Sequence, residues 1–98
     1  MQNEPHELAA QIMQHYGAEA QKDILIEECA ELIQAVEKTR RIAEKPVFTE
    51  DMVWEMADVY IMLLQFETQM SGYWRAEYHN AIMQQLQRQI ERIENEEG

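Results

Sequence analysis

The chain has 98 residues, 46% hydrophobic and 28% charged, which suits one small globular domain over residues 1–98 and excludes a disordered chain. Its 19 acidic and 8 basic residues give a formal net charge of −11, which excludes a general electrostatic attraction to nucleic acid. A single cysteine, Cys29, excludes an internal disulfide, and no apolar run approaches the ~20 residues of a membrane helix, so we expect a cytoplasmic protein.

The first two predicted elements are helices. Only 3 Gly and 2 Pro interrupt the chain, and the alternating pattern of strands is absent. The first helix is predicted over residues 5–17, with Pro5 in its first turn. The second is predicted over residues 19–38 or a little beyond. A connection over residues 40–49, which contains Pro46, separates it from the third.

The third and fourth predicted helices complete an all-α chain. The third opens at Thr49, a suitable N-cap, and runs to about residue 70, where Ser71 and Gly72 end it. The fourth is predicted over residues 73–94. Its apolar side chains form one narrow stripe: Tyr78, Ile82, Leu86, Ile90 and Ile93. Because short connections between long helices imply antiparallel neighbours, we expect a compact four-helix-bundle-like fold.

Two acids lie in an apolar stretch of the third helix. Residues 52–66 are apolar nearly all round the helix, a pattern typical of a buried helix. At about 100° per residue, Glu55 and Asp58 lie about 60° apart on one face. An unpaired buried carboxylate costs several kcal/mol, so these two are predicted to be neutralised, paired with cations or bound to metal.

The second helix has a similar group of acids. Its predicted core stripe consists of Leu25, Cys29, Leu32, Ile33 and Val36, which implies a buried thiol. Glu27, Glu28 and Glu31 fall on the opposite side of this helix. An antiparallel hairpin of the second and third helices would bring five carboxylates into one small volume.

Three interpretations of these acids compete. Ion pairs within the two stretches are excluded, because neither stretch contains Lys or Arg. The acids would otherwise line a solvated groove, or they would hold Mg²⁺ or Mn²⁺, which prefer carboxylate oxygens. Zinc is not expected, since no histidine or thiolate joins the cluster. Acidic pairs near the chain ends, such as Glu4 and Glu7, are interpreted as solvated surface.

The acidic stretches resemble a known family. The pattern EExxE followed by ExxD is typical of the all-α nucleoside triphosphate pyrophosphohydrolases, which include MazG, the dimeric dUTPases and phosphoribosyl-ATP pyrophosphatase. Here the pattern reads EECAE at residues 27–31 and EMAD at residues 55–58. The longer stretches EECAELIQAVEK and EMADVYIMLLQ look like short MazG-like proteins. The resemblance covers most of residues 20–70 and continues weakly through RQIERI at residues 88–93.

This resemblance implies a reaction and a site. The expected reaction is Mg²⁺-dependent cleavage of a nucleoside or deoxynucleoside triphosphate to the monophosphate and pyrophosphate. By analogy, the expected metal ligands are Glu28, Glu31, Glu55 and Asp58. Glu27 is expected to orient or deprotonate the attacking water, or to support a metal ligand from behind. A triphosphate also needs cationic contacts, for which the candidates are Lys38, Lys45, Arg88 and Arg92.

Three other functions are compatible with the same acidic helices. A phosphoribosyl-ATP pyrophosphatase-like enzyme is one alternative, although residues 58–62 lack the histidine common after its ADLLY-like stretch. A non-catalytic acidic helical interaction module is another. A MazG-like scaffold without activity stays open because residues 84–87 are rich in glutamine. Surplus apolar surface on the third and fourth helices predicts a symmetric homodimer or homotetramer. From the net charge and the short apolar runs, we expect no nucleic-acid or membrane partner.

Overall fold

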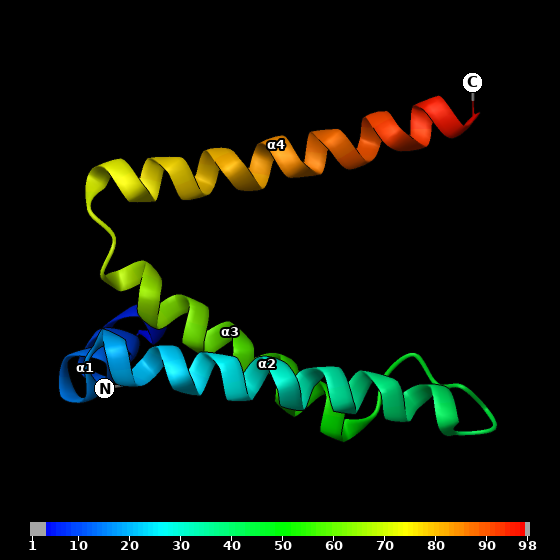
Figure 1. The fold of residues 1–98 in the computed structure, drawn as a ribbon, viewed down its shortest axis with the longest axis horizontal. Coiled ribbons are helices and arrows are strands. Elements are labelled where there is room, and N and C mark those ends of the chain that lie inside the picture. The colour runs from blue at the N-terminus through cyan, green and yellow to red at the C-terminus, as the bar shows by residue number, and fades with distance from the viewer. Residues whose placement is uncertain (1–3, 98) are drawn as a thin grey trace.

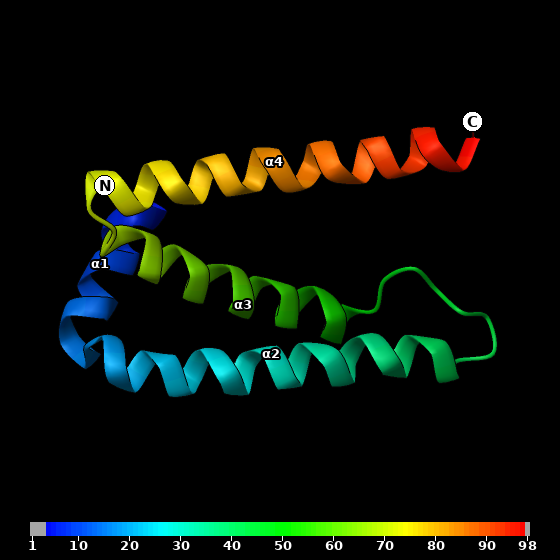
Figure 2. The same cartoon turned by 45° about the horizontal axis from the view of Figure 1, so that its top comes forward.

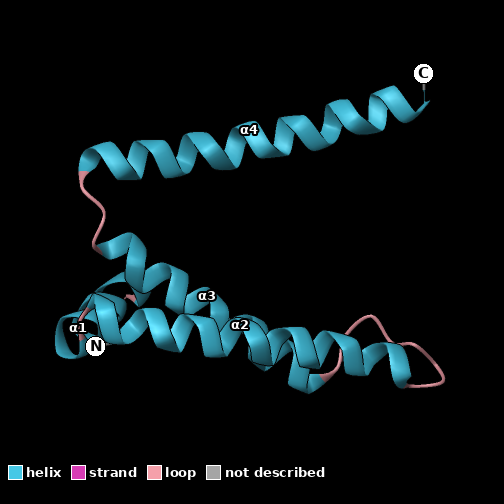
Figure 3. Ribbon diagram, viewed as in Figure 1, coloured by secondary structure: helices cyan, strands magenta, loops and turns pink. Residues whose placement is uncertain are grey.

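The computed structural model describes residues 4–97, and within that range the chain forms four α-helices and no strand (Figures 1 and 3). The helices are α1 (Pro5–Tyr16), α2 (Ala18–Arg41), α3 (Glu50–Thr68) and α4 (Gly72–Glu97). The predicted all-α fold class is therefore confirmed. None of the four helices has both the length and the apolar character that crossing a bilayer requires.

Local sequence sets the helix boundaries. Gly17 separates α1 from α2 with a φ of 87°, a backbone conformation that residues with a Cβ rarely adopt. Its N–H donates to the carbonyl oxygen of Met13 at 2.8 Å and closes the end of α1. At the start of α3, the hydroxyl of Thr49 accepts a hydrogen bond from the N–H of Met52 at 3.2 Å. The predicted N-cap is therefore confirmed.

The first three helices pack together. α2 and α3 run antiparallel side by side, and α1 packs on α3 near the start of α2 (Figures 1 and 2). The fully buried apolar side chains of this three-helix unit are few: Ala9, Met13, Ala35, Met62 and Leu64. The core is small, as expected for a chain of this length.

A buried polar pair fixes the register of α2 against α3. Gln21 and Gln65 are 5% and 2% exposed, and the Gln21 side-chain amide donates to Gln65 Oε1 at 2.7 Å. Gln21 lies seven residues before Glu28, and Gln65 lies seven residues after Asp58. Because seven residues are about two helical turns, the register that pairs the glutamines also sets Glu28 opposite Asp58.

Replacing Gln65 with Leu is expected to destabilise the fold by about 1–3 kcal/mol, because the buried amide of Gln21 loses its partner. The matched control is the double variant Gln21→Leu/Gln65→Leu, which removes both polar groups and should recover most of that loss. Urea unfolding followed by circular dichroism measures both. A double variant less stable than Gln65→Leu would contradict a pairwise role.

The face of α2 that turns inward differs from the sequence prediction. Cys29 and Ile33 were expected in the core, but both are exposed, Ile33 to 64%. Leu25, Leu32 and Val36 of the predicted stripe are half-buried, and they share the inward face with Gln21, Ala35 and the half-buried Glu28. The predicted buried thiol is therefore wrong. α2 has apolar residues on more than one face, and packing against α1 and α3 covers only one of these faces.

α4 stands apart from the other helices in the described chain (Figures 1 and 2). None of its residues is buried, so the expected compact packing of all four helices is not found within one chain. Its first two turns contact the end of α3: Arg75 Nη2 donates to the carbonyl oxygen of Glu67 at 3.1 Å, and His79 Nε2 lies 3.6 Å from Glu67 Oε1.

The prediction that α3 is buried all round is also wrong for a single chain. Only Met62, Leu64 and Gln65 are buried in this helix. Its remaining faces carry large exposed side chains, because α1 and α2 cover one side and α4 does not cover the other.

Candidate functional site

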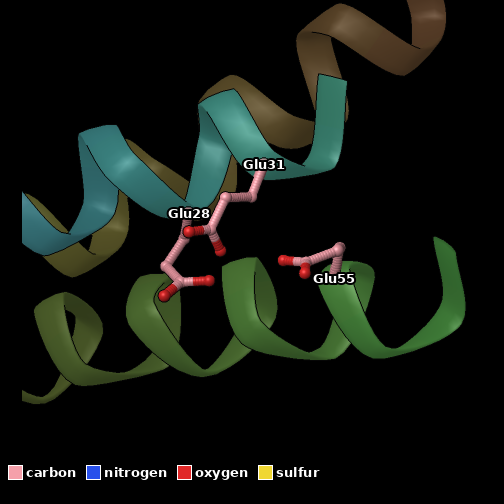
Figure 4. Close-up of side chains that lie close together, drawn as sticks. All are labelled: Glu28, Glu31 and Glu55. Carbon is pink, nitrogen blue, oxygen red and sulfur yellow. The ribbon is translucent and has the colours of Figure 1, made fainter. Parts of the chain in front are cut away.

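Three glutamate side chains converge between α2 and α3. Figure 4 shows Glu28 and Glu31 reaching from α2 toward Glu55 on α3. One carboxylate oxygen from each of the three lies within 4.8 Å of the other two. Glu28 and Glu55 are half-buried and Glu31 is exposed. The structure therefore brings together three of the four expected ligands, which come from both acidic stretches of the sequence.

The helices place these side chains by spacing and register. Residues three apart share a helix face, which pairs Glu28 with Glu31 on α2 and Glu55 with Asp58 on α3. The antiparallel register set by the buried glutamines then turns the two pairs toward each other. Asp58 is half-buried and lies outside the group of mutually close oxygens, yet its charge acts on both Glu28 and Glu55.

Burial and like charges oppose ionisation at the centre of the cluster. Burial raises the pKa of the Glu28 carboxyl above its ordinary value, and the charges of Glu31, Asp58 and Glu55 raise it further. Burial likewise raises the pKa of Glu55, with added contributions from Glu31, Asp58 and Asp51. Each of these effects favours the protonated acid, so the cluster holds its negative charge at a free-energy cost.

Nothing in the described chain compensates that charge. Oε2 of Glu28 and Oε2 of Glu55 are buried, and neither has a hydrogen-bond partner within residues 4–97. The ion pairs formed by the described residues lie elsewhere and involve Glu19, Glu37 and Glu67. Buried carboxylate oxygens without a partner are expensive to keep ionised, so these acids are neutralised either by protonation or by a bound cation.

The donor set fits a hard divalent cation. Octahedral Mg²⁺ binds oxygen at about 2.1 Å, which puts its ligands about 3.0–4.2 Å apart. One oxygen from each of Glu28, Glu31 and Glu55 lies within 4.8 Å of the other two, a wider limit than this range, so a bound ion would draw the three side chains closer together. The absence of nitrogen and sulfur donors from this group disfavours zinc.

Metal-free protein is expected to become more stable as the pH falls from neutral toward about 5. The raised pKa values of Glu28 and Glu55 mean that the folded state binds more protons than the unfolded state above their ordinary value of 4.5. This contribution to stability is present at low pH and is lost as the pH rises through the folded-state pKa values.

Urea unfolding in EDTA across this pH range measures the effect. The double variant Glu28→Gln/Glu55→Gln should show a smaller dependence on pH, because it removes the two groups with raised pKa values. An identical pH dependence in both proteins would contradict the assignment.

The remaining site candidates are not gathered around the cluster. Glu27 is exposed on α2 and lies outside the converging group. Lys38 is exposed two turns after Glu31, and Lys45 is exposed in the connection between α2 and α3. Arg88 and Arg92 lie on α4, away from the packed helices. No ion pair joins these cations to the cluster in the part of the chain described.

The sequence interpretation missed the Gln21–Gln65 pair. Its only sequence signal was the presence of Gln65 in an otherwise apolar stretch, and nothing marked Gln21 as its partner. Gln21 lies two turns before Glu28, and Gln65 lies two turns after Asp58. This matching spacing points to a pairing of the glutamines only when α2 and α3 are known to be antiparallel neighbours.

The chain matches no protein-family model, no curated protein and no solved structure. The function of the acidic cluster is therefore inferred from its residues, their geometry and the motif resemblance of residues 27–31 and 55–58.

Proposed function

We propose that the protein is a Mg²⁺-dependent pyrophosphohydrolase that cleaves nucleoside or deoxynucleoside triphosphates, with Mn²⁺ as a substitute ion. The observation that carries this proposal is the convergence of Glu28, Glu31 and Glu55 from two facing helices, where Glu28 and Glu55 each have a buried oxygen without a hydrogen-bond partner among residues 4–97. The order of the EECAE and EMAD stretches and their resemblance to the MazG-like fold and family support the same function.

The four acids of the cluster hold the cation in this proposal. Mg²⁺ bound there would neutralise the polyphosphate and lower the pKa of a coordinated water. Glu28, Glu31 and Glu55 supply oxygens from both helices, and Asp58 extends the set on the α3 side. Because all four lie on regular helices, their positions vary little, and the substrate can be held in a defined orientation.

The reaction consumes one water and breaks one phosphoanhydride bond. Water attacks the α-phosphorus, the bond to the oxygen bridging the α- and β-phosphates breaks, and the products are the monophosphate and pyrophosphate. Glu27, one helical turn before Glu31, is proposed to orient the water or accept its proton. Lys38, two turns after Glu31 on the same helix, is proposed to contact a phosphate group.

A panel of ribo- and deoxyribonucleoside triphosphates, assayed with Mg²⁺ or with EDTA, tests the proposal. We expect pyrophosphate and monophosphate in equal amounts from at least one substrate, and none in EDTA. Release of orthophosphate in place of pyrophosphate would contradict cleavage between the α- and β-phosphates. No release from any substrate would favour a non-catalytic acidic interaction module.

A further inference from the structure

An exposed tryptophan stands beside the acidic cluster. Trp54 directly precedes Glu55 on α3 and is 65% exposed. Within residues 4–97, its indole takes part in none of the aromatic pairs and in none of the side-chain hydrogen bonds. An indole presents a large apolar face that gains free energy when another planar ring covers it. This indole is therefore free to receive a ring from outside the described chain.

Helical geometry places Trp54 on the same edge of the α2–α3 interface as the outer acids. At about 100° per residue, Trp54 lies about 40° from Asp58 around α3 and one turn, about 6 Å, from it along the axis. On α2, Glu31 is rotated from Glu28 by the same angle and in the same sense as Asp58 is rotated from Glu55 on α3. Because the two helices are antiparallel, equal rotations turn toward the same edge of their interface. Trp54 continues that edge beyond Asp58.

The edge that carries Trp54 is open to solvent. On the opposite edge, Leu32 of α2 and Val59 of α3 are half-buried. α1 meets α3 around Ile61 and Gln65, two or more turns after Trp54 along α3. A molecule whose phosphates lie at the acids can therefore extend along this edge to the indole without displacing a buried side chain.

The charges around Trp54 favour an uncharged ring over a phosphate. Asp51 lies three residues before Trp54 on α3, and Asp58 lies four residues after it, so both carboxylates share its side of the helix. A phosphate without a metal ion would be repelled at this position. A nucleobase is neutral and planar, and it stacks on aromatic side chains whatever its identity, because every base has a π-face.

We propose that the indole of Trp54 stacks on the base of the nucleoside triphosphate while the acids hold its phosphates through the metal ion. This assignment rests on the proposed function, because phosphates held at the acidic cluster bring the base to Trp54. In a nucleotide only the sugar separates the base from the α-phosphate, which suits the single helical turn between Trp54 and Asp58. Trp54 therefore binds the part of the substrate that does not react, and it positions the phosphates by anchoring the other end.

A double-substitution cycle between Trp54 and the base tests the stack. Wild type and Trp54→Ala are compared on the most active triphosphate and on ribose 5-triphosphate, which has sugar and phosphates but no base. Loss of the base should raise the KM of the wild type about 10–100-fold and that of the variant less than about threefold. kcat should change much less, because the stack does not touch the reacting phosphorus. An equal effect of Trp54→Ala on both substrates would overturn the stack.

Trp74→Ala is the matched control for this cycle. Trp74 is 61% exposed on α4, where its ring packs edge-on against Tyr73 with the ring centroids 5.1 Å apart. Its variant should keep the wild-type KM for both substrates. Trp54→Ala should also keep the wild-type response of its melting temperature to Mg²⁺, which shows that the fold and the acids are intact.

Fluorescence detects the same contact without catalysis. The chain has two tryptophans, so Trp74→Phe leaves Trp54 as its only indole. A nucleoside triphosphate with a methylene group between the α- and β-phosphates, which resists cleavage there, should quench this indole in Mg²⁺, and ribose 5-triphosphate should not. Trp54→Phe, which retains Trp74, should show no quenching.

The two readouts separate the stack from the proposed activity. Cleavage of a triphosphate by the wild type without quenching of Trp54 would overturn the stack and leave the hydrolase standing. Quenching by the nucleotide analogue without cleavage of any triphosphate would support the stack and reject the hydrolase. The absence of both signals would overturn both.

Discussion

Glu28→Gln is expected to reduce pyrophosphate release by about 10²–10³-fold or more, the loss typical when a group that organises transition-state charge is removed. The substitution keeps the shape of the side chain and deletes the charge at the buried centre of the cluster. The fold should survive, since Glu28 makes no ion pair in the described chain and its charge opposes that of three neighbouring acids.

Steady-state assays on the most active triphosphate, at saturating Mg²⁺, measure this loss. Glu37→Gln is the matched control, because it makes the same change on the same helix at an exposed position that pairs with Arg40. It should retain activity within about twofold, since an exposed ion pair contributes little. Equal activity in the Glu28 and Glu37 variants would remove Glu28 from the reaction.

Asp58→Asn is expected to lose most of the stabilisation that Mg²⁺ gives the wild type. A ligand that binds only the folded state stabilises it by about 2.7 kcal/mol at a hundredfold excess over its dissociation constant. A neutral amide is a poor ligand for a hard dication, so the variant should gain much less. In EDTA, the same variant should be as stable as the wild type or more stable, because one of the clustered charges is gone.

Thermal melts of both proteins with Mg²⁺ and with EDTA, at one fixed protein concentration, make the comparison. Asp23→Asn serves as the control, because Asp23 is exposed on α2 and lies outside the cluster. The control should respond to Mg²⁺ as the wild type does. Identical responses in the Asp58 variant and the wild type would count against metal binding at this position.

The helices, and the pairing of acids on one face of each helix, could be predicted from local sequence. Pro5, Gly17 and Thr49 act within one turn of their own position, so the limits of α1 and the start of α3 follow from the chain alone. The i, i+3 spacing of the acids also places the two members of each pair on the same face of their helix. These features do not depend on which helices pack together.

The rotation of α2 and the position of α4 could not be predicted in the same way. α2 carries apolar side chains around much of its circumference, and periodicity does not say whether Cys29 or Glu28 turns inward. The buried bond between Gln21 and Gln65 belongs to the inward face, and it joins residues 44 positions apart. For α4, the apolar stripe predicts that its side chains pack against another surface, but periodicity does not identify that surface.

The near-complete separation of α4 from the three-helix unit has a consequence for sequence change. In the described chain, Arg75 donates a hydrogen bond to Glu67 of α3, and His79 lies beside the carboxylate of the same residue. α4 contributes no buried side chain to the packing of α2 against α3. Substitutions along most of α4 can therefore accumulate without disturbing the packing that positions Glu28, Glu31 and Glu55, because the two segments share few contacts.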